Sequence, residues 1–106
     1  MRLRSRVDTN HGAVVAALEE VGCAVLSLAA LGRGCPDLLV HSPWRTPPGL
    51  LLLEVKAGRG DLTDAQERFI DDWPGVVYVV RSPQQALEAA GLAVSSAASI
   101  ARRRTG

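Results

Sequence analysis

Two segments decide the fold: residues 34–41 read GCPDLLVH, and residues 50–56 read LLLLEVK. The β-prone runs within them, 37–41 and 50–55, each predict a strand. Residues 42–49 hold three prolines and a glycine, which indicates a loop that joins two adjacent strands. Because the second run is apolar at successive positions, it is typical of a strand in the middle of a sheet that is covered on both faces.

Residues 8–22 have the spacing of a helix. Apolar side chains recur there at intervals of three and four, as on one face of a helix. Asp8 or Asn10 can cap its start, and Gly22 suits a left-handed residue at its end. A short β-prone run at residues 24–28 predicts a first strand.

The second half of the chain carries clearer start signals. Thr63 and Gln66 have the form of a capping box, in which each side chain bonds the backbone of the other residue. Residues 76–80 are strongly β-branched and predict a strand. Residues 82–91 predict a last short helix, with serine as its cap and proline in its first turn. The capping box predicts that a helix starts at Thr63. We expect this helix to bury three apolar side chains in the core, Phe69, Ile70 and Trp73.

The predicted order is helix, strand, strand, strand, helix, strand, helix. This order indicates an α/β domain with a mixed β-sheet flanked by helices on both faces. We take residues 1–91 as a single domain and residues 92–106 as a basic tail rich in alanine, serine and arginine. The sequence leaves open whether this tail lacks structure or folds on a partner.

The composition is that of one globular domain. The chain has 106 residues, of which 47% are hydrophobic and 22% are charged, so the composition excludes a disordered or fibrous protein. A formal net charge of +1 argues against a purely electrostatic nucleic-acid binder. Half of the twelve basic residues lie at the two ends of the chain, however, and residues 7–101 hold six basic and eleven acidic side chains. This distribution suits an enzyme that holds phosphates through a metal ion and terminal arginines.

The sequence predicts neither a membrane protein nor a secreted protein. The apolar run at residues 50–53 is too short to span a bilayer, and residues 1–6 are basic with no apolar segment behind them. Cys23 and Cys35 lack the spacing of a zinc site or of a disulfide framework. We therefore expect two reduced thiols, packed as small hydrophobic side chains, in a cytoplasmic protein.

The residues that suggest chemistry are Asp37, Glu54 and Lys56. Glu54 and Lys56 are two apart in a predicted strand, so they project to the same face. We place Asp37 and Lys56 at opposite ends of a simple hairpin, and therefore expect that a bend or an offset is needed to bring Asp37 near Glu54. Two carboxylates and a backbone carbonyl, such as that of Val55, form a hard oxygen site suited to Mg²⁺ or Mn²⁺. Lys56 beside such a site can hold an attacking water.

Each of these residues also has a purely structural interpretation. Asp37 after a proline is typical of a turn, and the capping box alone explains Gln66. Glu54 and Lys56 can form a surface ion pair. Glu54 follows four leucines in a strand predicted to be buried, however, and a buried carboxylate needs a partner or a metal.

The pattern Pro36-Asp37 followed by Glu54-Val55-Lys56 resembles the PD-(D/E)xK nuclease superfamily. Over about residues 7–90, and with Thr63-x-x-Gln66 downstream, the chain looks like the small stand-alone, phage-type VRR-NUC proteins. The resemblance implies a restriction-endonuclease-like core, bacterial or phage-encoded, that cleaves DNA with Mg²⁺. It also implies homodimers that act on four-way DNA junctions, as Holliday-junction resolvases do.

The resemblance assigns roles to single residues. Asp37 and Glu54 would be metal ligands, Lys56 would position the water or stabilise charge, and Gln66 would orient the lysine or a phosphate. The family often has an acidic residue on its first helix, where this sequence has His11. This difference puts a second metal ion in doubt, and Asp8 is the candidate substitute.

Two further positions concern DNA contact and the first helix. Arg33 and Arg59, each between glycines, are the candidate DNA contacts, and a solvated side chain is the alternative for Arg59. His11 falls on the same predicted face as the apolar residues of its helix, so a histidine in the core or at the site's edge is the alternative to a ligand.

The leading functional hypothesis is a Mg²⁺-dependent, structure-selective DNA endonuclease. One alternative is a non-catalytic DNA-binding module with the same fold, motivated by His11. The other is a restriction or defence nuclease that cuts duplex DNA, although 106 residues leave little room for a separate sequence-reading domain.

Overall fold

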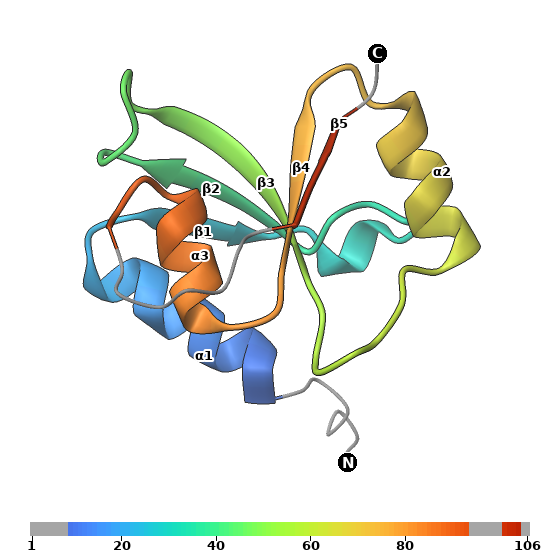
Figure 1. The fold of residues 1–106 in the computed structure, drawn as a ribbon, viewed down its shortest axis with the longest axis horizontal. Helices are drawn as coiled ribbons and strands as arrows, with labels where there is room; N and C mark the ends of the chain where they lie inside the picture. The colour runs from blue at the N-terminus through green and yellow to red at the C-terminus, as the bar shows by residue number, and fades with distance from the viewer. Residues whose placement is uncertain (1–8, 94–100, 105–106) are drawn as a thin grey trace.

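A mixed β-sheet runs through the centre of the protein, in a computed structural model that describes residues 9–93 and 101–104 (Figure 1). In this described part the sheet has five strands in the order β1-β2-β3-β4-β5. Strands β3 and β4 are parallel, and the other neighbouring pairs are antiparallel. The strands are β1 (Ala24–Ser27), β2 (Leu38–Ser42), β3 (Gly49–Val55), β4 (Val76–Val80) and β5 (Ala101–Arg104).

Helices cover both faces of this sheet. Helices α1 and α3 lie on one face and α2 lies on the other (Figure 1). A short 3-10 turn follows β1. The helices are α1 (Thr9–Glu20), η2 (Ala29–Leu31, the 3-10 turn), α2 (Asp64–Asp72) and α3 (Pro83–Ala89). The predicted α/β class with a mixed, flanked sheet is confirmed, as is the predicted order of helices and strands up to α3.

The alternation of side chains along β3 assigns its residues to the two faces. Leu51, Leu53 and Val55 pack in the cluster formed with α1 and α3. Leu52 packs on the other face, in the cluster around Ile70 of α2. Because residues two apart share a face, Glu54 lies on the same side as Leu52, under α2.

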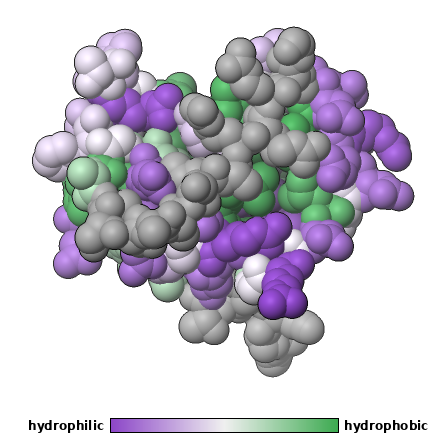
Figure 2. All heavy atoms as spheres, in the orientation of Figure 1, coloured by the Kyte–Doolittle hydropathy of each residue, from purple (hydrophilic) through white to green (hydrophobic). Residues whose placement is uncertain are grey.

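The helices do not cover the sheet evenly, so the expected burial of Leu50 and of Trp73 is wrong. Leu50 at the start of β3 is 66% exposed, and Trp73 at the end of α2 is 40% exposed. Helix α2 spans only nine residues and packs on β3 and β4, so its face of the sheet stays open beside β1 and β2. Leu26 and Leu31 are exposed as well. Hydrophobic side chains also reach the surface between the β2–β3 hairpin and α2, while hydrophilic ones follow the outer side of α2 (Figure 2).

The segment predicted as a basic tail contributes a strand. Residues 101–104 form β5, which pairs antiparallel with β4, Val76 lying opposite Arg104. The sequence analysis did not predict this strand, because Ala-Arg-Arg-Arg lacks the apolar alternation that marks a half-buried strand. Within the described ranges, no helix is both long enough and apolar enough to cross a membrane.

Candidate active site

Asp37 and Glu54 lie next to each other because of the β2–β3 register. Leu38 pairs with Leu53, so the residue before β2 lies beside the last residues of β3. Asp37 Oδ2 accepts a hydrogen bond from the Val55 N–H at 2.8 Å. The expectation that a bend is needed was wrong, since the start of the first strand of an antiparallel hairpin lies beside the end of the second.

The turn before β2 is fixed against the start of α2. Gly34 has a φ of +77°, and a Cβ at this position would lie 2.1 Å from the carbonyl oxygen of Ala65. Only glycine accepts both the left-handed backbone and this close approach. The Leu28 N–H donates to the Asp37 carbonyl at 2.7 Å. These contacts place Asp37 and the first turn of α2 on the same side of the sheet.

Glu54 is 2% exposed, and one of its hydrogen-bond partners comes from α2. Gln66 Nε2 donates to Glu54 Oε2 at 2.9 Å. Gln66 Oε1 accepts from the Thr63 N–H at 2.8 Å, and Thr63 Oγ1 accepts from the Gln66 N–H at 3.1 Å. The predicted capping box is confirmed, and Gln66 contacts the candidate site as well. The two interpretations of Gln66 therefore do not exclude each other.

The carboxyl of Glu54 is strongly perturbed. Its pKa is raised from 4.5 to about 8, mainly by burial and next by the negative charge of Asp37. A side-chain hydrogen bond with Asp37 also contributes to this rise, while the Lys56 ammonium opposes it. At neutral pH the carboxyl of Glu54 therefore keeps its proton, unless a cation takes the proton's place.

Lys56 follows β3 and is half-buried. Its N–H donates to the Val80 carbonyl at 3.0 Å, which extends the pairing of β3 with β4 by one residue. Its carbonyl accepts from Asn10 Nδ2 at 2.9 Å. The effect of Lys56 on the pKa of Glu54 puts its ammonium within electrostatic reach of the carboxyl pair. The structure therefore brings Asp37, Glu54, Lys56 and Gln66 together.

Cys35 adds a thiol to this neighbourhood, which the sequence analysis did not foresee. Both cysteines are free, as predicted; Cys23 is buried and Cys35 is half-buried. Burial raises the pKa of the Cys35 thiol, and the negative charges of Glu54 and Asp37 raise it further. Cys35 is therefore kept in its neutral form and behaves as a small apolar neighbour of the carboxyl pair.

The carboxyl pair fits one hard divalent cation with few protein ligands. Asp37 and Glu54 supply oxygens, and the carbonyl of Val55 is the third candidate. Within residues 9–93 and 101–104, no three His, Cys, Asp or Glu side chains gather as a metal-binding group. Mg²⁺ is commonly bound through one or two carboxylates and keeps several waters. The observation that favours such an ion here is the buried carboxyl of Glu54, which lies beside Asp37 and otherwise keeps a proton at neutral pH.

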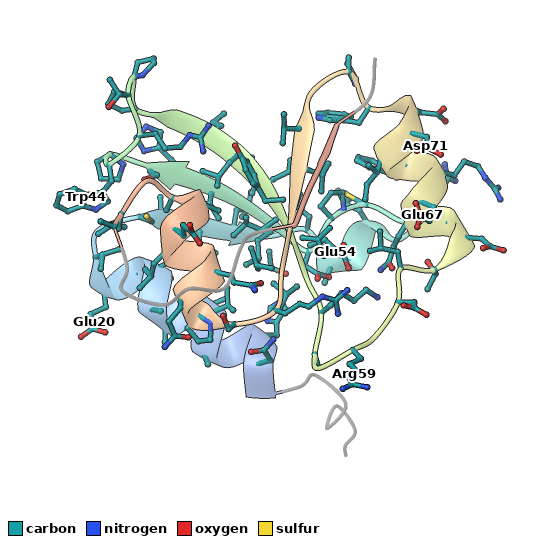
Figure 3. All side chains as sticks on the ribbon, in the orientation of Figure 1. Glu20, Trp44, Glu54, Arg59, Glu67 and Asp71 are labelled. Atoms are coloured by element: carbon teal, nitrogen blue, oxygen red, sulfur yellow. The ribbon has the colours of Figure 1, made fainter. Side chains whose placement is uncertain are left out.

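The other candidate residues lie around this pair or outside the described part. Asp8 lies outside the described residues. His11 is half-buried in the first turn of α1, and it is not among the groups that shift the pKa of Glu54. Arg59 is exposed at the tip of the loop after β3, while Glu54 lies inside the molecule near the start of α2 (Figure 3). Arg33 is exposed and lines an open hollow of about 370 Å³ along α2, together with Trp73.

Sequence reasoning missed the roles of Asn10 and Arg81. Asn10 is the second residue of α1 and not its cap. Its amide donates to the carbonyls of Lys56 at 2.9 Å and Arg81 at 3.2 Å. Arg81 donates to two carbonyls of the loop after β3. No local pattern indicates these contacts, since they join segments that are more than 20 residues apart.

Comparison of the chain with family models, with curated proteins and with solved structures finds no significant match.

Proposed function

We propose that this protein is a Mg²⁺-dependent endonuclease that hydrolyses phosphodiester bonds in DNA. The observation that carries the proposal is the approach of Asp37 to buried Glu54, with Lys56 beside them. The motif resemblance to VRR-NUC proteins of the PD-(D/E)xK superfamily supports the proposal, and so does a mixed sheet flanked by helices. We assign the core to the restriction-endonuclease-like class on the same grounds.

Each residue has a defined task in this proposal. A bound Mg²⁺ would activate a water and neutralise charge that builds up on the phosphodiester. The Val55 N–H holds Asp37 in place, and Gln66 holds Glu54. Lys56 orients the attacking water and stabilises its deprotonated form. With Glu54 fixed by α2 and Asp37 fixed by β3, the two carboxylates need little rearrangement to bind the ion.

We further propose a branched substrate, such as a four-way junction, and a homodimer. Resolving a junction takes two opposed cuts, and the described residues of one chain form a single such carboxyl pair. We expect a second copy to pack on the exposed apolar side chains beside the open part of the sheet, which are Leu26, Leu31 and Leu50.

Arg33 and Arg59 are the proposed phosphate contacts. We place the protein in the cytoplasm.

Cleavage of labelled DNA tests this function. We expect the purified protein to cut a four-way junction with Mg²⁺ and to leave it intact with EDTA. Lys56→Ala should lower the cleavage rate about 10²- to 10⁴-fold, the usual range for the loss of a proton-transferring group. Glu20→Gln, which removes an exposed charge at the end of α1, is the control and should cut like the wild type.

Other outcomes would point to other functions. If neither the junction nor linear duplex is cut with any divalent metal, and Lys56→Ala behaves as wild type, the nuclease proposal is wrong. Tight junction binding without cleavage would favour a non-catalytic DNA-binding module. Discrete fragments from plasmid DNA would favour a duplex-cutting restriction or defence nuclease. A monomeric mass with and without DNA would contradict the homodimer.

A further inference from the structure

The parallel strands β3 and β4 end side by side, and one side chain from α1 joins their ends. Val55 pairs with Val80, and the Lys56 N–H donates to the Val80 carbonyl at 3.0 Å. Asn10 Nδ2 donates to the Lys56 carbonyl at 2.9 Å and to the Arg81 carbonyl at 3.2 Å. One amide nitrogen thus bonds the first carbonyl beyond each strand, so the backbone at Lys56 is fixed from both sides.

Arg81 holds the loop that follows Lys56, residues 57–61. Its Nη1 donates to the Gly58 carbonyl at 3.0 Å and to the Gly60 carbonyl at 2.8 Å. The Gly60 N–H donates to the Ala57 carbonyl at 2.9 Å, which closes a turn. Gly58 has a φ of +51°, in the left-handed region. A loop with two glycines has many open conformations, and a charged donor that bonds two of its carbonyls selects one of them.

Arg81 is itself anchored on both sides of its backbone. Its N–H donates to Gln85 Oε1 of α3 at 2.7 Å, and its carbonyl is bonded by Asn10. Arg81 is half-buried and its guanidinium bonds the loop carbonyls at the surface, whereas Arg59 in the same loop is exposed. Arg81 is therefore placed to hold the loop in one conformation, whereas Arg59 is placed to contact a ligand outside the protein.

We propose that Asn10 and Arg81 are positioning residues of the candidate active site. Asn10 fixes the backbone at Lys56, and Arg81 holds the 57–61 loop in the shape that presents Arg59 to a DNA phosphate. The part of this inference that concerns DNA rests on the proposed function. The part that concerns the loop and the strand ends holds for the free protein and is tested separately.

Amide hydrogen exchange of the free protein tests the support itself. In Arg81→Gln, the Gly60 amide should exchange at least about tenfold faster than in the wild type, because two charge-assisted bonds to the loop are lost. In Asn10→Ala, the Lys56 amide should exchange faster, since the ends of β3 and β4 are no longer joined. Arg68→Gln removes the same charge from α2 and should change neither amide. Unchanged exchange at Gly60 or Lys56 in a folded variant would overturn the corresponding assignment.

Binding to a four-way junction in EDTA tests whether Arg81 acts through Arg59. Arg81→Gln should weaken binding in the wild-type background, and its effect should be several-fold smaller in the Arg59→Ala background. If the double variant loses as much affinity as the product of the two single losses, this role is overturned, because Arg81 then acts independently of Arg59. If the wild type binds no DNA, the proposed function fails together with the role of Arg59. The exchange experiment then still decides whether Asn10 and Arg81 hold the loop and the strand ends.

Discussion

Gln66 Nε2 lies 2.9 Å from Glu54 Oε2 and links the start of α2 to the buried carboxyl. The orientation of this amide follows from the capping box. Because Gln66 Oε1 accepts from the Thr63 N–H at 2.8 Å, its nitrogen faces Glu54. Gln66, the third residue of α2, therefore completes the capping box and is also the donor that holds Glu54. The start of α2 and the candidate site therefore form one structural unit.

Gln66→Glu separates the two tasks of this residue. Glutamate at this position keeps the capping box, because its carboxylate also accepts from the Thr63 N–H. It removes the donor to Glu54 and sets a third carboxyl against the pair. We expect the free energy of unfolding to fall by about 1–3 kcal/mol, because the buried Glu54 carboxyl loses its donor, and the cleavage rate to drop about tenfold or more, the size of one lost hydrogen bond to a charged group. Thermal melting and junction cleavage measure the two effects.

Thr63→Ala is the matched control for that experiment. It removes the cap and leaves the Gln66–Glu54 bond, so it should lower the free energy of unfolding by about 0.5–2 kcal/mol. Cleavage by the folded variant should stay near the wild-type rate. If Gln66→Glu and Thr63→Ala affect cleavage equally, Gln66 acts only as a helix cap.

The raised pKa of Glu54 predicts a pH dependence of stability without metal. The folded protein holds a proton up to about pH 8 that the unfolded chain releases near pH 4.5. The free energy of unfolding should therefore fall as the pH rises between these two values. The stabilisation that comes from the Glu54 proton should be fully present only below about pH 4.5. Urea unfolding in EDTA across this range measures it.

Glu54→Gln is the control for the pH dependence. Its amide can still accept from Gln66 and does not titrate, so the fall seen for the wild type should be absent. Other titrating groups are common to both proteins and cancel in the difference. Parallel curves for the two proteins would contradict a raised pKa at Glu54.

Excess Mg²⁺ should stabilise the wild type more as the pH rises towards about 8, because the ion then competes less with the proton on Glu54. An ion at 100 times its dissociation constant adds about 2.7 kcal/mol to the free energy of unfolding. Asp37→Asn and Glu54→Gln each remove one carboxylate and should lose most of this gain. Melting temperatures with Mg²⁺ and with EDTA measure it. An equal gain in all three proteins would place the ion elsewhere.

Gly34→Ala should disturb the site through packing. Its added methyl would lie 2.1 Å from the Ala65 carbonyl oxygen, so the turn before Asp37 and the start of α2 must separate. We expect a loss of stability of more than about 3 kcal/mol, above the backbone cost alone. Gly32→Ala is the control: it has a φ of +67° and open space around the added carbon. It should lose only about 1–3 kcal/mol, and equal losses would contradict the packing argument.

Much of the architecture was predictable because its signals are local. The Thr63–Gln66 capping box, the serine cap of α3 and the loop between β2 and β3 appear in the structure as expected. The proximity of Asp37 and Glu54 also follows from an antiparallel hairpin. The expectation of a bend failed because it placed the start of one strand at the wrong end of the other.

The sequence by itself determined the helices and strands up to α3, and it nominated Asp37, Glu54, Lys56 and Gln66. Caps, turns and apolar periodicity act over a few residues, so they can be recognised without the fold. Only the tertiary structure decided what surrounds these residues: the bond from Gln66 to Glu54, the support from Asn10 and the raised pKa of Glu54. Burial and electrostatic shifts depend on groups that the sheet and α2 bring together from distant positions, and no local pattern encodes those distances.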